Sequence, residues 1–151
     1  QQECLQVNRL LDQYWKQSTA IKNKMHGEEV LGNPSKRVDR SLKKTLKHLQ
    51  KEIAELEAYL TELVKQEYQQ ELILLESIPG MGRKTATMLL VLTDGMKRFS
   101  TAGELCSYAG ITPVIRTSGT SVNGRPRISK VGNRKLRNLL FMCSFTACNC
   151  N

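Results

Sequence analysis

Positive charge gathers in the last third of the chain. The last acidic residue is Glu104, and residues 105–151 carry seven basic side chains and no Asp or Glu. These are Arg116, Arg125, Arg127, Lys130, Arg134, Lys135 and Arg137. The whole chain has 23 basic and 14 acidic residues, for a formal net charge of +9. A soluble surface can have this composition, but a block without local neutralisation favours binding of a polyanion such as nucleic acid.

A proline and two glycines stand between two apolar runs in the stretch SIPGMGRK, residues 77–84. Pro79 stops a helix because its nitrogen carries no hydrogen, and glycine can take positive φ. The pattern resembles a helix-hairpin-helix motif, in which N–H groups at a helix start hold a backbone phosphate without reading bases. The candidate contacts are Gly80, Gly82, Arg83, Lys84 and Thr85. A tight corner between packed helices is the alternative.

Residues suited to metal or acid–base chemistry are sparse. The five cysteines form no CxxC pair, and acids such as Asp12, Asp39 and Asp94 lack metal-ligand spacing, so we expect no metal site. His26 and His48 are expected to face solvent. Free thiols indicate a reducing cytosol, and the chain has no apolar run long enough to span a membrane.

The first half of the chain, residues 1–70, is predicted to consist of two helices. One covers residues 3–26, and the second carries an a/d seam with alternating steps of four and three. The seam consists of Leu42, Leu46, Leu49, Ile53, Leu56, Leu60 and Leu63. It favours an antiparallel hairpin with the first helix or, alternatively, a dimer. Because the first helix is shorter and less regular, we expect part of the seam to stay uncovered and to join a second copy.

Residues 71–151 are predicted to form a small helical domain with the helix-hairpin-helix motif. Thr101 and Glu104 form a capping box that opens a helix ending at Gly110. Residues 114–128 can form a short β-hairpin with an Asn-Gly turn at 123–124, and a last helix follows Asn133. The predicted fold class is therefore mainly α: a helical coiled-coil hairpin and then this domain.

Three linked motifs carry a family resemblance. "IPGMGRKTATMLL", "RFSTAGELCSYAGITP" and "SGTSVNGRPRISKVGNRKLRNLL" occur in this order, and together they resemble the C-terminal domain of the IS-one-ten (IS110) family of transposases. That family includes the Piv/MooV site-specific invertases. The match runs from about Leu74 to Ala147, and the heptad segment is similar to the coiled coil that such proteins carry between two catalytic parts.

The resemblance implies more than the residues alone. It implies an N-terminal RuvC-like domain, absent here, whose four carboxylates bind Mg²⁺, a structured bridge RNA that guides DNA pairing, and dimers of dimers. It also implies a serine that attacks a DNA phosphate, carried here onto Ser118, with Ser121 and Ser129 as rivals. The candidate nucleic-acid contacts in this region are Arg116, Arg125, Arg127, Lys130, Asn133, Arg134, Lys135 and Arg137.

The expected function is DNA transposition or site-specific recombination for a mobile element in the bacterial cytoplasm. The chain begins without Met and stops within an expected helix, so we expect a fragment. Because it lacks the carboxylates that the resemblance implies, we expect the chain to be inactive alone. The alternative is a non-enzymatic helix-hairpin-helix DNA-binding module on a dimerising coiled coil. Only the recombinase should lose its chemistry in Ser118→Ala.

Overall fold

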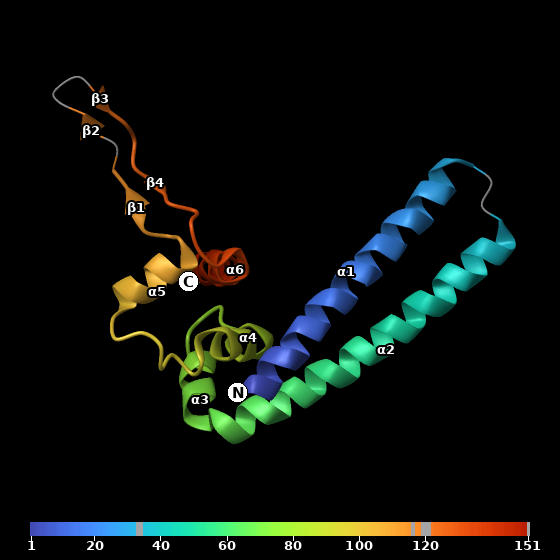
Figure 1. Cartoon of the computed structure of the whole chain (residues 1–151), viewed down its shortest axis with the longest axis horizontal. Helices are drawn as coiled ribbons and strands as arrows, with labels where there is room; N and C mark the ends of the chain where they lie inside the picture. Colours follow the sequence, from blue (N-terminus) through green and yellow to red (C-terminus); the bar gives the residue numbers. More distant parts are fainter. Residues whose placement is uncertain (33–34, 116, 119–121, 151) are drawn as a thin grey trace. The chain divides into compact units, whose positions relative to one another are not determined.

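The computed structural model describes residues 1–32, 35–115, 117–118 and 122–150, and they form a mainly helical protein, as predicted (Figure 1). Two compact units divide the chain, residues 1–67 and residues 68–151.

The first unit is a hairpin of α1 (Gln2–Val30) and α2 (Lys36–Glu67). The two helices run antiparallel along their lengths (Figure 1). Every residue of the predicted seam is buried or half-buried, with Ile53 4% and Leu60 2% exposed. The hairpin reading is therefore confirmed.

The predicted uncovered part of the seam is absent from this hairpin. The helix α1 continues beyond residue 26 to Val30, and its last turns face the start of α2. Met25 and Glu28 lie around the same small hollow as Leu42, the first seam residue. The expectation of an uncovered stretch is wrong because α1 is longer than its irregular apolar pattern suggested.

The second unit holds α3 (Gln69–Glu76), α4 (Arg83–Thr93), α5 (Ala102–Ala109) and α6 (Arg134–Cys150). Its core is built on Leu89, Ala109 and Leu136, one residue from each of α4, α5 and α6. Burying apolar surface from three helices holds the unit together, since burial is the main favourable term in folding.

Both ends of α5 follow the sequence prediction. At its start, Thr101 Oγ1 accepts a hydrogen bond from the Glu104 N–H at 3.3 Å, and Glu104 Oε2 accepts one from the Ser100 N–H at 2.7 Å. At its end, Gly110 is left-handed with φ 71°. The capping box and the glycine stop fix where α5 begins and ends.

A β-arm, which we define as β1 to β4, connects α5 to α6. The strand β1 (Pro113–Val114) pairs antiparallel with β4 (Arg127–Ile128), and β2 (Thr117–Ser118) pairs with β3 (Val122–Asn123). In Figure 1 this narrow ribbon extends away from α5 and α6. The predicted β-hairpin is therefore present.

The predicted turn at Asn123-Gly124 is wrong, because Asn123 pairs with Thr117 inside the ladder. Ser118 pairs with Val122, and residues 119–121 between them lie outside the described set. Three positions, 124–126, separate β3 from β4, whereas two separate β1 from β2. Gly124 therefore lies in the segment between β3 and β4 and not in the hairpin turn.

Candidate nucleic-acid interface

A basic hollow lies at the base of the β-arm. Its lining residues are Val114, Gly124, Arg125, Arg127, Ile128, Ser129 and Lys130. The side chains of Arg125, Arg127 and Lys130 are exposed, and Ser129 is half-buried. The structure thus brings together three cations that the sequence proposed as nucleic-acid contacts, in a stretch of chain without acidic residues. The arrangement produces a positive concave surface.

The segment between β3 and β4 contributes to this hollow. Residues 124–126 separate the two strands, and Gly124 and Arg125 from this segment line the hollow together with Arg127, which begins β4. The sequence predicted a turn at Asn123-Gly124 instead, so the position of this segment beside β4 is the feature that sequence reasoning missed.

A clasp joins α5 to the start of α6; we define it as Tyr108, Ala109, Asn133 and Arg137. The Asn133 N–H donates to the Tyr108 carbonyl at 2.7 Å, and Asn133 Nδ2 donates to the Tyr108 hydroxyl at 3.2 Å. Arg137 Nη1 donates to the Ala109 carbonyl at 2.8 Å. Asn133 Oδ1 also accepts from the Leu136 N–H at 3.1 Å, which caps α6. Two proposed nucleic-acid contacts, Asn133 and Arg137, thus hold the fold together.

Glycine permits this close approach at the clasp. A Cβ atom on Gly110 would lie 2.7 Å from both the Val131 carbonyl oxygen and Arg137 Nη1. Gly110 also has φ 71°, which disfavours a side chain independently of space. The chain segment after the β-arm therefore packs directly on the end of α5.

Gly80 in the SIPGMGRK stretch has a packing role. Its φ is 82°, and a Cβ there would lie 2.5 Å from the Cys143 carbonyl oxygen and 2.9 Å from the Ala147 nitrogen, both on α6. Gly82, in contrast, stands before the first turn of α4 with open space around it. Gly80 thus fits the tight-corner alternative, whereas Gly82 lies at the exposed helix start, where a phosphate could approach.

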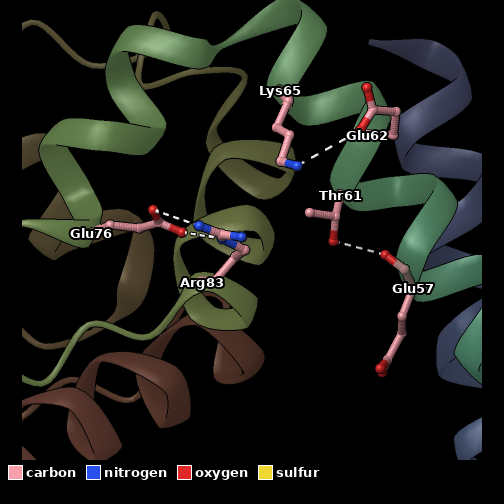
Figure 2. Close-up of polar contacts among 6 residues, drawn as sticks. All are labelled: Glu57, Thr61, Glu62, Lys65, Glu76 and Arg83. Carbon is pink, nitrogen blue, oxygen red and sulfur yellow. Dashed lines mark hydrogen bonds and ion pairs between the residues drawn. The ribbon is translucent and has the colours of Figure 1, made fainter.

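Arg83 forms an ion pair with Glu76 across the same bend. Arg83 Nε lies 2.6 Å from Glu76 Oε1 and Nη2 lies 3.3 Å from Oε2, as Figure 2 shows. This carboxylate raises the pKa of Arg83. Lys84 is exposed and Thr85 is half-buried in the first turn of α4. Glu76 therefore reduces the positive charge that this bend would offer to a phosphate.

The bend and the basic hollow are separate places in the second unit. The bend packs on α6 at Cys143 and Ala147, whereas Arg134 and Lys135 lie in the first turn of α6. At 1.5 Å per residue, these two regions of α6 are about 15 Å apart along its axis. The predicted contacts thus form two groups.

Ser118 lies in β2, where it pairs with Val122. It is four residues beyond Val114, a separation of at most about 13 Å at 3.3 Å per residue of extended chain. Of its two rivals, Ser129 lines the basic hollow, and Ser121 lies outside the described residues, as does Arg116.

Among the residues that the structure describes, no His, Cys, Asp and Glu side chains gather in groups of three or more that could hold a metal ion. In the same parts of the chain, none of the helices combines the length and apolar character needed to cross a bilayer.

The second unit is thus a mainly helical domain that carries a basic β-arm. The family model described as "Transposase IS116/IS110/IS902 family" matches residues 73–151, just over half of the chain. The chain therefore belongs to this transposase family, which confirms the resemblance carried by the three sequence motifs.

Relatives of known name support this assignment. The chain is 41% identical over 75 residues to the 43.6 kDa protein of insertion element IS110 from Streptomyces coelicolor, covering 50% of this chain and 18% of that protein. It is 34% identical over 99 residues to the pilin gene-inverting protein of Moraxella lacunata, covering 64% of this chain and 31% of the relative. The chain thus spans less than a third of the length of these relatives.

Proposed function

We propose that this chain is the C-terminal part of a DNA transposase or site-specific recombinase in which Ser118 is the nucleophile. The observation that carries the proposal is the β-arm: Ser118 lies in β2, where it pairs with Val122, and three exposed cations lie at the base of the arm. The pilin gene-inverting relative supports a DNA rearrangement as the reaction.

In the proposed step, the hydroxyl oxygen of Ser118 attacks the phosphorus of a DNA phosphodiester. A serine–phosphorus ester forms, the bond from phosphorus to one sugar oxygen breaks, and the serine proton is transferred away while the sugar oxygen takes up a proton. Nothing is oxidised or reduced. Attack by the released sugar hydroxyl of another strand on the phosphoserine then completes the exchange.

The cations at the base of the arm would bind the DNA strand whose phosphate is attacked. A serine hydroxyl is a weak nucleophile until a base or metal activates it. Mg²⁺ held by an N-terminal carboxylate domain would supply that activation. The chain's own contribution is to bind the DNA and to present the serine, so we expect this chain alone to be inactive.

The other parts of the chain would support binding and assembly. The start of α4, with Gly82, Lys84 and Thr85, would hold a backbone phosphate in the manner of a helix-hairpin-helix motif. The proposed partners are DNA, a structured guide RNA and a second copy of the protein. Because α1 covers the seam of α2, that copy would contact the outer surface of the helical hairpin.

Covalent trapping tests the proposal. A protein that carries this chain behind the carboxylate domain would be incubated with Mg²⁺, guide RNA and nicked DNA, denatured, digested and mapped by mass spectrometry. We expect a DNA adduct on the peptide containing Ser118 that is lost in Ser118→Ala, while DNA binding is retained. An adduct on Ser121 or Ser129 would show that this serine, and not Ser118, is the nucleophile, and it would leave the proposed reaction unchanged.

No adduct from a preparation that still recombines DNA would exclude a serine intermediate. A protein that binds DNA but neither recombines it nor forms an adduct would favour the non-enzymatic binding module. The matched control is Ser107→Ala on α5, because Ser107 is an exposed serine of the same unit outside the β-arm.

A further inference from the structure

We propose that the basic hollow at the base of the β-arm is a site for a single phosphodiester of a nucleic-acid strand, and that Lys130 is its central residue. The inference deepens the proposed function, on which its link to Ser118 rests. It starts from the backbone of Lys130, which the proposed chemistry does not explain.

Lys130 has a left-handed backbone conformation, with φ 58°. This region is disfavoured for a residue with a Cβ atom, and glycine or asparagine would occupy it more readily. Neighbouring hydrogen bonds impose the conformation: the Lys130 N–H donates to the Gly110 carbonyl and the Ser129 N–H to the Thr112 carbonyl, each at 3.0 Å. The fold therefore gains nothing from a lysine here, and strained residues of this kind cluster at functional sites.

The other residues that line the hollow indicate a function for Lys130. Its ammonium group shares the hollow with the guanidinium groups of Arg125 and Arg127, and the Ser129 hydroxyl offers a further donor. Guanidinium groups bind phosphate oxygens through paired N–H donors. Together these four side chains offer ample donors for the two non-bridging oxygens of a phosphodiester, and their positive charge exceeds its single negative charge, so the hollow attracts such a group strongly.

The rest of the lining favours a sugar–phosphate backbone over a free anion. Val114 and Ile128 are 40% and 44% exposed, so apolar surface borders the cations and can contact sugar carbons. The described lining holds no aromatic ring on which a base could stack. The predicted contact is therefore independent of base sequence.

The site would set the register of the strand relative to Ser118. The base of the arm lies at most about 13 Å from Ser118, at 3.3 Å per residue of extended chain. That distance corresponds to at most about four nucleotides at 3.4 Å per nucleotide along one strand. Holding one phosphate at the base would thus present a particular later phosphate to the serine.

The test measures the stability and the nucleic-acid affinity of one variant, because the inference predicts opposite changes in the two. Lys130→Gly relieves the left-handed strain, so we expect the melting temperature of this chain to rise by about 2–4 °C. The same substitution removes a phosphate contact, so affinity for a labelled oligonucleotide should fall about tenfold. The slope of log affinity against log salt should become shallower by about one. Fluorescence anisotropy with single-stranded DNA, duplex DNA and RNA probes would show which backbone is preferred.

Two controls make the result specific. Lys130→Asn should show the same opposed changes, because asparagine also tolerates the left-handed region. Arg98→Ala removes one positive charge from an exposed position of the same unit outside the hollow, and it should change affinity less than twofold. Equal losses of oligonucleotide affinity in Arg98→Ala and Lys130→Gly would mean that only the net charge matters, and they would overturn the proposed site.

Normal oligonucleotide binding by Lys130→Gly would also overturn the inference. Competition by inorganic phosphate at low millimolar concentration would overturn it too, because it would indicate a pocket for small anions. Ser118→Ala should bind all three probes as the unaltered chain does. Failure of the serine chemistry and failure of the phosphodiester site therefore give different results.

Discussion

Arg137 Nη1 lies 2.8 Å from the carbonyl oxygen of Ala109, so the first turn of α6 is bonded to the last residue of α5. A cation also suits that position, because the C-terminal end of a helix carries partial negative charge. The two ends of the β-arm leave the body of the unit close to this bond, at Pro113 and Ile128. The Arg137 contact is therefore part of what holds the base of the arm.

Arg137→Ala should destabilise the second unit. The substitution removes a charge-assisted hydrogen bond from a half-buried side chain, and we expect a loss of about 1–2 kcal/mol in the free energy of unfolding. Arg134→Ala is the matched control, since Arg134 is exposed in the same helical turn. Urea unfolding followed by circular dichroism measures both. Equal losses in the two variants would mean that the Arg137 contact contributes nothing particular.

The two glycines of the bend should respond differently to alanine. In Gly80→Ala, the new Cβ meets the backbone of α6 at 2.5 Å and φ stays at 82°, so a loss above about 2 kcal/mol is expected. In Gly82→Ala the Cβ enters open space, so stability should change by less than about 1 kcal/mol. Thermal unfolding would compare them, and a Gly80→Ala variant as stable as the original chain would contradict the packing role.

The sequence predicted the elements with strong local signals. The a/d seam predicted α2. Thr101, Glu104 and Gly110 predicted both ends of α5, because capping interactions form between residues that are close in sequence. It did not predict the clasp, since Tyr108 and Arg137 are far apart in the chain and meet only through tertiary packing. The turn at Asn123-Gly124 failed for a similar reason: pairing across the arm set the register, and it overrode a local turn preference.

The candidate site shows the same division. Charge composition proposed Arg125, Arg127 and Lys130 as nucleic-acid contacts, and that role stays a prediction. The three residues line one hollow because they are close in sequence on one arm. The packing roles of Gly80, Asn133 and Arg137 were not readable, because glycine, asparagine and arginine serve nucleic-acid contacts and helix packing equally well. Only their neighbours in space distinguish the two roles.

Glu76→Gln should strengthen nucleic-acid binding at the bend. The substitution removes a carboxylate that lies 2.6 Å from Arg83, so the guanidinium becomes available to a phosphate and local positive charge rises by one unit. Affinity for duplex DNA at low salt should rise about two- to fivefold, with a steeper salt dependence. Stability should change by less than about 1 kcal/mol because Arg83 is largely exposed.

Anisotropy titrations at several salt concentrations measure the effect of Glu76→Gln. Glu71→Gln is the charge-matched control, because Glu71 lies on the same helix α3 and outside the bend. An unchanged affinity in Glu76→Gln, or an equal gain in Glu71→Gln, would argue that the bend is only a helix corner and binds no phosphate.

Cys4 should make the helical hairpin less stable in alkaline solution. Its side chain is 2% exposed, and burial, with a smaller effect of Glu67, raises its pKa above the ordinary 9.0. Below about pH 9 the thiol keeps its proton in both folded and unfolded chains, and its stabilising contribution is complete. As the pH rises further, the unfolded chain loses this proton first, so the contribution of Cys4 is lost through the raised pKa of the folded state.

Urea unfolding of the chain and of Cys4→Val at pH 7.5 and pH 10 measures this contribution. Valine keeps the apolar volume but cannot ionise, so the unaltered chain should lose more stability between these pH values than the variant does. Tyr59, whose pKa is raised mainly by its hydrogen bond to Glu3 and to a smaller extent by the charge of Cys4, is present in both chains, so the larger part of its contribution cancels in the comparison. Cys148→Val, at an exposed position, is the control. An identical pH dependence of stability in the unaltered chain and Cys4→Val would show that burial does not raise the pKa of the Cys4 thiol.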